Sequence, residues 1–302
     1  MFSTVLLFKD ALYGALVIAL ACSVLGVYVV LRRIVFVGAA LAEISSAGIA
    51  LALWLSGRGF GGELTHHPVV FSLLFGLAGA LFFSIGGTPR AGVPPDATIG
   101  VTYAVAAAAG ILLIAKASVG EAHDIFLQGN ILGITRTDTI VLLAIAIPVL
   151  LAHIFFYKEF LFVSFDRETA RTLGFGVTAW NALLYFTLGL VIAFSMQFAG
   201  VMLVFNFLVL PAVTGLLLAR SMGGIFAIAI GSAIIAAIVG FTLSVPFDLP
   251  SGPAIIAASG VLAAVAWVAR RGLRRAKLCS RSLSAAAPAG RAAPLRARRA
   301  SR

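Results

Sequence analysis

The stretch "GAALAEISSAGIALAL" (38–53) decides the fold class. It lies within a 22-residue run, 34–55, that is uncharged apart from Glu43. At about 1.5 Å per residue, one helix of this length crosses the roughly 30 Å hydrocarbon core of a bilayer. The whole chain is similar in character, with 302 residues, 61% hydrophobic, 11% charged and a mean hydropathy of +1.10. Soluble domains carry about a quarter charged residues, so the sequence predicts an all-α, polytopic transmembrane helical bundle.

Nine apolar blocks have the length of a membrane span. They are 11–31, 34–55, 68–87, 97–115, 139–156, 179–196, 199–219, 222–244 and 253–269. The sixth and seventh are nearly fused through Gln197, and spans rich in Gly and Ala can be broken or re-entrant, so eight or ten spans stay open. Pro211 lies inside the seventh block, where the loss of a backbone hydrogen bond predicts a kink.

Charge is concentrated at the C-terminal end of the chain. The net charge is +11, and residues 270–302 hold eleven Lys or Arg and no Asp or Glu. We interpret 1–270 as a transmembrane domain and 271–302 as a basic, disordered tail beside anionic lipid headgroups, with no role for nucleic acid. With nine spans and the N-terminus outside, 18 Lys and Arg face the cytoplasm against 4 outside, so the positive-inside rule places the C-terminus in the cytoplasm.

Motifs for catalysis and nucleotide binding do not occur in the sequence. It has no G-x-x-x-x-G-K-[ST] loop for ATP and no triad or H-E-x-x-H site. The two cysteines, Cys22 and Cys279, are far apart and offer neither a disulfide framework nor a metal pair. An enzyme and a bound cofactor are therefore not expected, which leaves transport or scaffolding.

Glu43 is the best candidate for a functional group inside the membrane. A charged group at mid-span costs several kcal/mol unless it faces protein or water. At helical spacing its neighbours are small, and they are Ala39, Ser46, Ala47 and Ala50. Small residues allow close helix approach and leave room for a lumen. Glu43 either lines a pathway or joins helices as a hydrogen-bonded structural residue.

Other polar groups offer weaker candidates. A candidate translocation path is formed by Ser46, by Gln197 between the sixth and seventh blocks, and by Asn206 and Pro211 in the seventh block. His66 and His67, at the outer edge of the third span, suit a divalent metal, although neighbouring histidines do not share a helix face and a solvated loop is the alternative.

The longest predicted cytoplasmic connection contains a short helix signal at 166–174. Asp166 can cap the helix, Glu168 lies in its first turn, Arg171 lies near its end, and Gly174 is a plausible C-terminal cap.

Five stretches in order resemble the membrane permease subunits of bacterial metal-ion ABC importers over about residues 5–270. They are "FVGAALAEISSAGIALAL" (36–53), "PDATIGVTYAVAAAAGILLI" (95–114), "GNILGITRTD" (129–138), "SFDRETARTLGFGV" (164–177) and "MQFAGVMLVFNFLVLPAVTGLLL" (196–218). The resemblance implies a multi-pass, homodimeric permease in the bacterial inner membrane. Its implied partners are a separate ATP-binding cassette ATPase and an extracytoplasmic metal-binding protein.

The resemblance also implies roles for particular residues. The loop that would dock on the ATPase corresponds to Phe165, Asp166, Glu168, Ala170, Arg171, Leu173 and Gly174. Where the family has G-D-A-L-S-H, with Asp and His on one helix face, this chain has Ala39 and Glu43. We therefore expect Glu43, with His66 and His67, to handle a divalent metal ion, most simply zinc or manganese, as transported substrate. A proton-coupled secondary transporter and a non-transporting scaffold are the alternatives.

Overall fold

The computed structural model describes residues 8–59, 67–86, 94–117 and 131–286, and every regular element in them is helical. The elements, in chain order, are α2 (Lys9–Leu31), α3 (Phe36–Gly57), α4 (Pro68–Gly86), α5 (Pro95–Lys116), the 3₁₀ turn η2 (Ile131–Gly133), α7 (Arg136–Phe155), α8 (Tyr157–Phe165), α9 (Arg167–Thr172), α10 (Val177–Leu218), α11 (Met222–Ser244) and α12 (Ser251–Ala286). The all-α fold class predicted from the sequence is confirmed.

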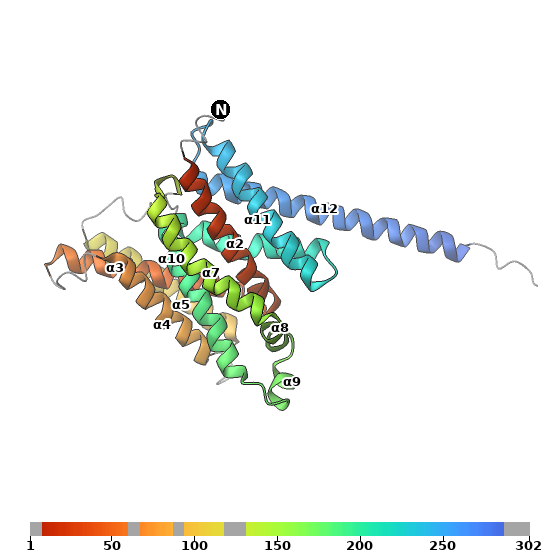
Figure 1. Ribbon diagram of the computed structural model, residues 1–302, viewed down its shortest axis with the longest axis horizontal. Helices are drawn as coiled ribbons and strands as arrows, with labels where there is room; N and C mark the ends of the chain where they lie inside the picture. Colours follow the sequence, from red (N-terminus) through yellow and green to blue (C-terminus); the bar gives the residue numbers. More distant parts are fainter. Residues whose placement is uncertain (1–7, 60–66, 87–93, 118–130, 287–302) are drawn as a thin grey trace, which may run out of the picture.

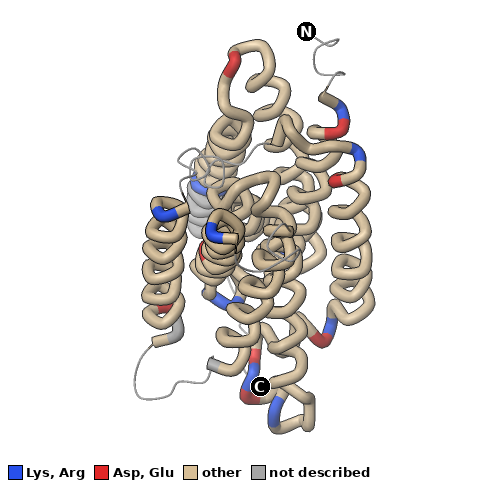
Figure 2. Tube along the Cα trace, turned by 90° about the vertical axis from the view of Figure 1, so that its left-hand side faces the viewer, with Lys and Arg blue, Asp and Glu red and all other residues tan. Residues whose placement is uncertain are grey.

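Eight of the described helices are long and apolar enough to cross a membrane. Figure 2 shows that charged residues gather toward helix ends and connecting segments. Within these spans, every described Lys, Arg, Asp and Glu lies in the first or last turn except Glu43. The distribution follows from the cost of placing a charge in hydrocarbon.

α10 accounts for the difference between eight helices and nine predicted spans. Its 42 residues contain one with non-helical dihedral angles, Gly200, at φ 75° and ψ 163°. A straight helix of this length would measure about 63 Å, twice the hydrocarbon thickness. The chain therefore has two helical halves here, and in Figure 1 the green first half and the teal second half run in different directions.

The break lies close to the predicted boundary between the sixth and seventh blocks at Gln197, and not at the kink predicted for Pro211. The helical assignment continues through Pro211, and the non-helical residue lies eleven positions earlier, at Gly200. Glycine has no Cβ and tolerates a backbone conformation at positive φ that other residues rarely adopt. Pro211 removes one backbone hydrogen bond but leaves the helix continuous, whereas the dihedral angles of Gly200 interrupt it.

The bundle consists of two helix groups that α10 joins. α3 packs against α4 and α5, while α2 packs against α7 and α11, and α10 contacts α2, α3, α4, α11 and α12. α2 and α10 approach very closely, because a Cβ on Gly26 would lie 2.0 Å from the carbonyl oxygen of Leu208. Helices in lipid gain no hydrophobic free energy by associating, so close van der Waals packing of this kind holds them together.

α12 extends beyond the rest of the bundle at its C-terminal end (Figure 1). The helix continues to Ala286, whereas the sequence analysis placed a disordered tail from residue 271. Helix-favouring residues explain the extension, because no proline occurs between Pro253 and Pro288. The domain boundary at residue 270 stays a prediction.

Candidate translocation site

Glu43 lies inside the bundle, two turns into α3. Its side chain is 7% exposed, and Ala39 and Ala47 on the same face are 9% and 6% exposed. α3 packs against α4, α5 and α10, so this face meets protein. The inward orientation that the small-residue stripe indicated is present in the structure.

Ala39, one turn before Glu43, lines an open hollow of about 410 Å³ on the surface of the bundle, where Asp96, Tyr103 and Met202 are exposed. Three elements form its walls, which are α3, α5 and the second half of α10. The lining residues are Phe36, Ala39, Asp96, Gly100, Tyr103, Val201, Met202 and Phe205. Asp96 carries the only carboxylate among them, and Tyr103 adds a phenol oxygen.

Two of the lining residues come from the starts of their helices. Phe36 is the first residue of α3, and Asp96 is in the first turn of α5. α2 ends four residues before α3 begins, and Arg32 at that end hydrogen-bonds to Ser164 of α8, which leads into α9. The Glu43 face of α3 thus continues, at Ala39, into a hollow that bears the Asp96 carboxylate.

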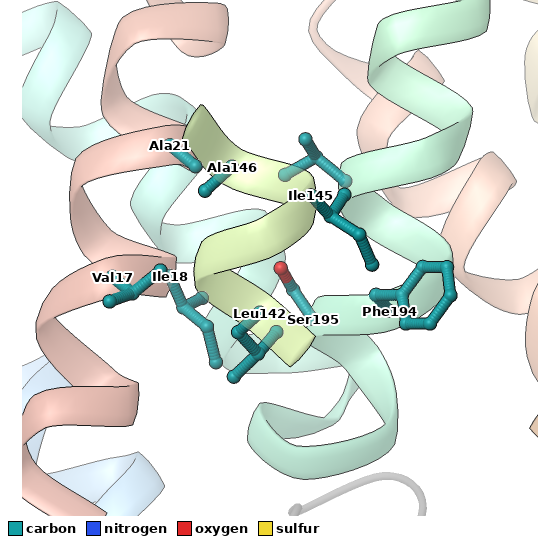
Figure 3. Close-up of a pocket in the computed structure, with 9 residues that line it drawn as sticks. Val17, Ile18, Ala21, Leu142, Ile145, Ala146, Phe194 and Ser195 are labelled. Atoms are coloured by element: carbon teal, nitrogen blue, oxygen red, sulfur yellow. The ribbon is translucent and has the colours of Figure 1, made fainter. Parts of the chain in front are cut away.

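A second hollow, shown in Figure 3, lies between α2, α7 and α10. Its volume is about 10 Å³, and the Ser195 hydroxyl is the only side-chain polar group among its lining residues. About 10–15 Å³ is needed for one water molecule. This hollow is a packing defect and gives no passage to a hydrated ion.

The four predicted path residues have different surroundings. Ser46 is buried on the Glu43 face of α3, and Pro211 is buried within α10. Gln197 donates to the carbonyl oxygen of Ala193 in its own helix at 3.1 Å. Asn206 donates to Ser259 of α12 at 3.0 Å, which makes it a link between two helices. None of these four lines the 410 Å³ cavity.

Of the two predicted histidines the structure describes His67, which it does not bring together with Glu43. His66 lies outside the described residues, and His67 is exposed just before α4. α3 continues for 14 residues beyond Glu43, to Gly57, which is roughly 20 Å of helix before the chain goes on to His67. In the part of the chain that the structure describes, no three His, Cys, Asp or Glu side chains gather as metal ligands.

The predicted short helix is present as α9. Asp166 accepts a hydrogen bond from the Thr169 backbone N–H at 2.9 Å and another from its hydroxyl at 2.6 Å. These bonds lower the pKa of the Asp166 carboxyl. At the other end Gly174 has φ 82°, and Phe175 N–H donates to the carbonyl oxygen of Ala170 at 3.0 Å. Both caps predicted from the sequence are therefore present.

One side of α9 packs on the bundle, and its surroundings present apolar groups outward. Ala170 is fully buried, whereas Phe165 and Leu173 are 57% and 65% exposed. Glu168 and Arg171 are also exposed. In Figure 1 α9 lies at one extremity of the molecule. Large apolar side chains exposed beyond a capped helix at a membrane-protein end are typical of a protein-binding surface.

The ABC 3 transport family matches residues 5–270. The chain belongs to this family. Over 261 residues, 86% of each chain, it is 31% identical to the "Manganese transport system membrane protein MntC" of Halalkalibacterium halodurans. It is also 29% identical to the "Probable iron transport system membrane protein" of Haemophilus influenzae, over 82% of this chain and 88% of the relative.

Solved structures give the same result for the fold. "PsaBC from Streptococcus pneumoniae in complex with Fab" matches with a TM-score of 0.73 and 25% identity, over 86% of this chain and 90% of that one. A putative metal-chelate type ABC transporter in an inward-facing conformation matches at a TM-score of 0.67. The resemblance inferred from the sequence is confirmed: this is a multi-pass permease subunit of a metal ABC importer, and it is not an enzyme.

Two polar residues of this permease were not singled out by the sequence analysis. Arg32 and Asn181 lie 149 positions apart, yet Arg32 Nη1 donates to Asn181 Oδ1 at 2.7 Å. Arg32 was counted only for orientation, and Asn181 lies at the border of a predicted span. The sequence signal that could have identified Asn181 was a polar residue in the first turn of a predicted span.

Proposed function

We propose that this permease passes a divalent metal ion, with manganese as the favoured substrate, along the Glu43 face of α3 to the cavity bearing Asp96. The observation that carries the proposal is the buried carboxylate of Glu43 on a small-residue face that continues into that cavity. Carboxylate oxygens are hard ligands, which suit manganese better than they suit zinc. The relatives named for manganese and iron transport support this substrate class.

Transport is driven by a separate ATPase that docks on α9. The exposed apolar side chains of Phe165 and Leu173 beside the fixed helix give that partner a surface at one end of the bundle. A second copy of the permease and an extracytoplasmic metal-binding protein complete the importer. The chain resides in the bacterial inner membrane with α9 and the C-terminus in the cytoplasm, as its Lys and Arg distribution indicates.

Uptake into proteoliposomes tests this function. The permease is reconstituted with its ATPase, and the initial rate of radioactive manganese uptake is measured with and without ATP. A hydrogen bond to a charged group contributes about 1.5–3 kcal/mol. Glu43→Gln is therefore expected to lower the ATP-dependent rate at least about tenfold. Zinc and iron are compared in the same vesicles.

Asp248→Asn is the matched control for loss of one carboxylate. Asp248 is exposed between α11 and α12 at φ 51°, a conformation that Asn also tolerates. This variant is expected to transport at the wild-type rate. Uptake that needs a proton gradient instead of ATP would support a secondary transporter. Full activity of Glu43→Gln would exclude Glu43 from the route.

A further inference from the structure

Asn181, in the first turns of α10, connects four other parts of the bundle. Its Oδ1 accepts from Arg32 Nη1 at 2.7 Å and from Arg167 Nη2 at 2.9 Å. Its Nδ2 donates to the carbonyl oxygen of Ser84 at 3.2 Å, and Arg32 Nε donates to Ser164 Oγ at 2.9 Å. The end of α2, the end of α4 and α9 therefore meet at one amide, while α8 joins through Arg32, and we call these five residues the Asn181 node.

In the Asn181 node, the guanidinium groups of Arg32 and Arg167 donate hydrogen bonds to uncharged acceptors. Asn181 is 6% exposed, and the acceptors that the structure shows for Arg32 are the oxygens of Ser164 and Asn181. Hydrogen bonds from a guanidinium are about twice as strong as those between neutral groups. Burial and the neighbouring Arg167 lower the pKa of Arg32 to about 10, so its guanidinium is still charged at neutral pH. The two arginine donors also fix which way the Asn181 amide faces.

A rigid turn links Arg32 to the helix that carries Glu43. Arg33 has φ 61°, its N–H donates to the carbonyl oxygen of Val30 at 3.1 Å, and Ile34 N–H donates to that of Val29 at 3.1 Å. This pair of bonds is the Schellman motif, which closes the end of α2. α3 begins at Phe36, so a displacement of Arg32 reaches the start of α3 through three closely held residues.

We propose that Asn181 is a positioning residue for transport, which ties α9 to the α2–α3 turn so that a movement of α9 shifts the helix carrying Glu43. The inference rests on the proposed function, because it assumes that the ATPase moves α9. Arg167 supplies the connection to α9, and Arg32 supplies the connection to α3. The bond to Ser84 extends the same movement to α4, which packs against α3.

The number of manganese ions imported per ATP hydrolysed tests the node in the reconstituted complex. Asn181→Ala and Arg167→Ala are each expected to lower this ratio at least about fivefold. Asn181→Asp keeps oxygen acceptors for both arginines, so its ratio of manganese imported to ATP hydrolysed is expected to be close to that of the wild type. Arg167 is exposed, so Arg167→Ala leaves no buried group unpaired and tests the link even where Asn181→Ala folds poorly.

Asp138→Asn is the control, because Asp138 belongs to a helix-capping box at the start of α7 and has no bond to the node. A wild-type ratio in Asn181→Ala or Arg167→Ala overturns the proposal.

A second measurement does not depend on the transported metal. The rate at which a thiol reagent labels Ala39→Cys, with Cys279 replaced by Ser, is compared with and without ATP. The node is expected to be required for any ATP-dependent change. Such a change without metal uptake would contradict the proposed function and leave the node intact.

Discussion

At the residue scale, the proposed metal route depends on two positions one turn apart. The resemblance to metal-ion permeases implies Asp and His at the positions of Ala39 and Glu43. Here Glu43 is a buried carboxylate, and Ala39 borders a cavity that also holds Asp96. The site therefore offers oxygen donors from α3 and α5 and no imidazole among the cavity-lining residues. Such a donor set indicates a preference for harder cations.

Restoring the implied pair is expected to change metal preference. Ala39→Asp combined with Glu43→His places one carboxylate and one imidazole on the same face of α3, and the adjoining cavity has room for the added side chain at position 39. The ratio of zinc to manganese uptake is expected to rise, because imidazole suits zinc. Competition between the two metals in the uptake assay measures it. An unchanged ratio would mean that selectivity is set elsewhere.

At the element scale, α9 is the segment proposed to contact the ATPase. Asp166 fixes its start, Gly174 fixes its end, and Ala170 anchors one side, which leaves Leu173 exposed. The lowered pKa of Asp166 means that its contribution to stability is present at neutral pH. That contribution is lost only in acid, as the pH falls through the lowered folded-state pKa. α9 is therefore expected to keep its cap throughout the physiological range.

Reversing one charge on α9 is expected to weaken ATPase binding. Arg171→Glu changes an exposed residue and should leave membrane insertion and thermal stability unaffected. The amount of ATPase that co-purifies with the permease is the measurement. Arg58→Glu, an exposed change just after α3, is the matched control. Undiminished co-purification of the Arg171 variant would argue against docking at α9.

The sequence predicted the elements better than their contacts. Hydropathy was sufficient for the spans, and cap chemistry was sufficient for α9, because both are local properties. The boundary between the sixth and seventh predicted blocks, at Gln197, lies three residues from the break at Gly200, whereas the kink predicted at Pro211 is not where the dihedral angles leave the helical range. The bonds of Asn181 to Arg32 and Ser84 join residues that are far apart in the chain, and only the folded bundle brings them together.

At the scale of the whole molecule, the number of crossings after α9 decides where the C-terminus lies. If α10 crosses once, three spans separate α9 from the end of α12, and if its two halves each cross, four do. An even number returns the chain to the side of α9. The break at Gly200 therefore determines whether the basic end of the chain and α9, the proposed ATPase-docking element, share a compartment.

Thiol labelling measures this topology. Thr172→Cys on α9 and the native Cys279 are expected to react with a membrane-impermeant reagent from the same side of sealed vesicles. Cys22 is buried within α2 and should stay unlabelled. Reaction of the two positions from opposite sides would show that α10 crosses only once.

The turn between α2 and α3 has a further consequence for how this chain can vary in length. Each residue added to a helix rotates the remainder of that helix by about 100°. One extra residue at the start of α3, after the closed turn at Arg33, would swing Glu43 away from the face it shares with Ala39 and into the direction of Ile44, which packs against Gly79 of α4. Insertions and deletions at this point should therefore be far rarer among functional variants than substitutions, and the spacing from Arg32 to Glu43 should be held more strictly than the residues that fill it.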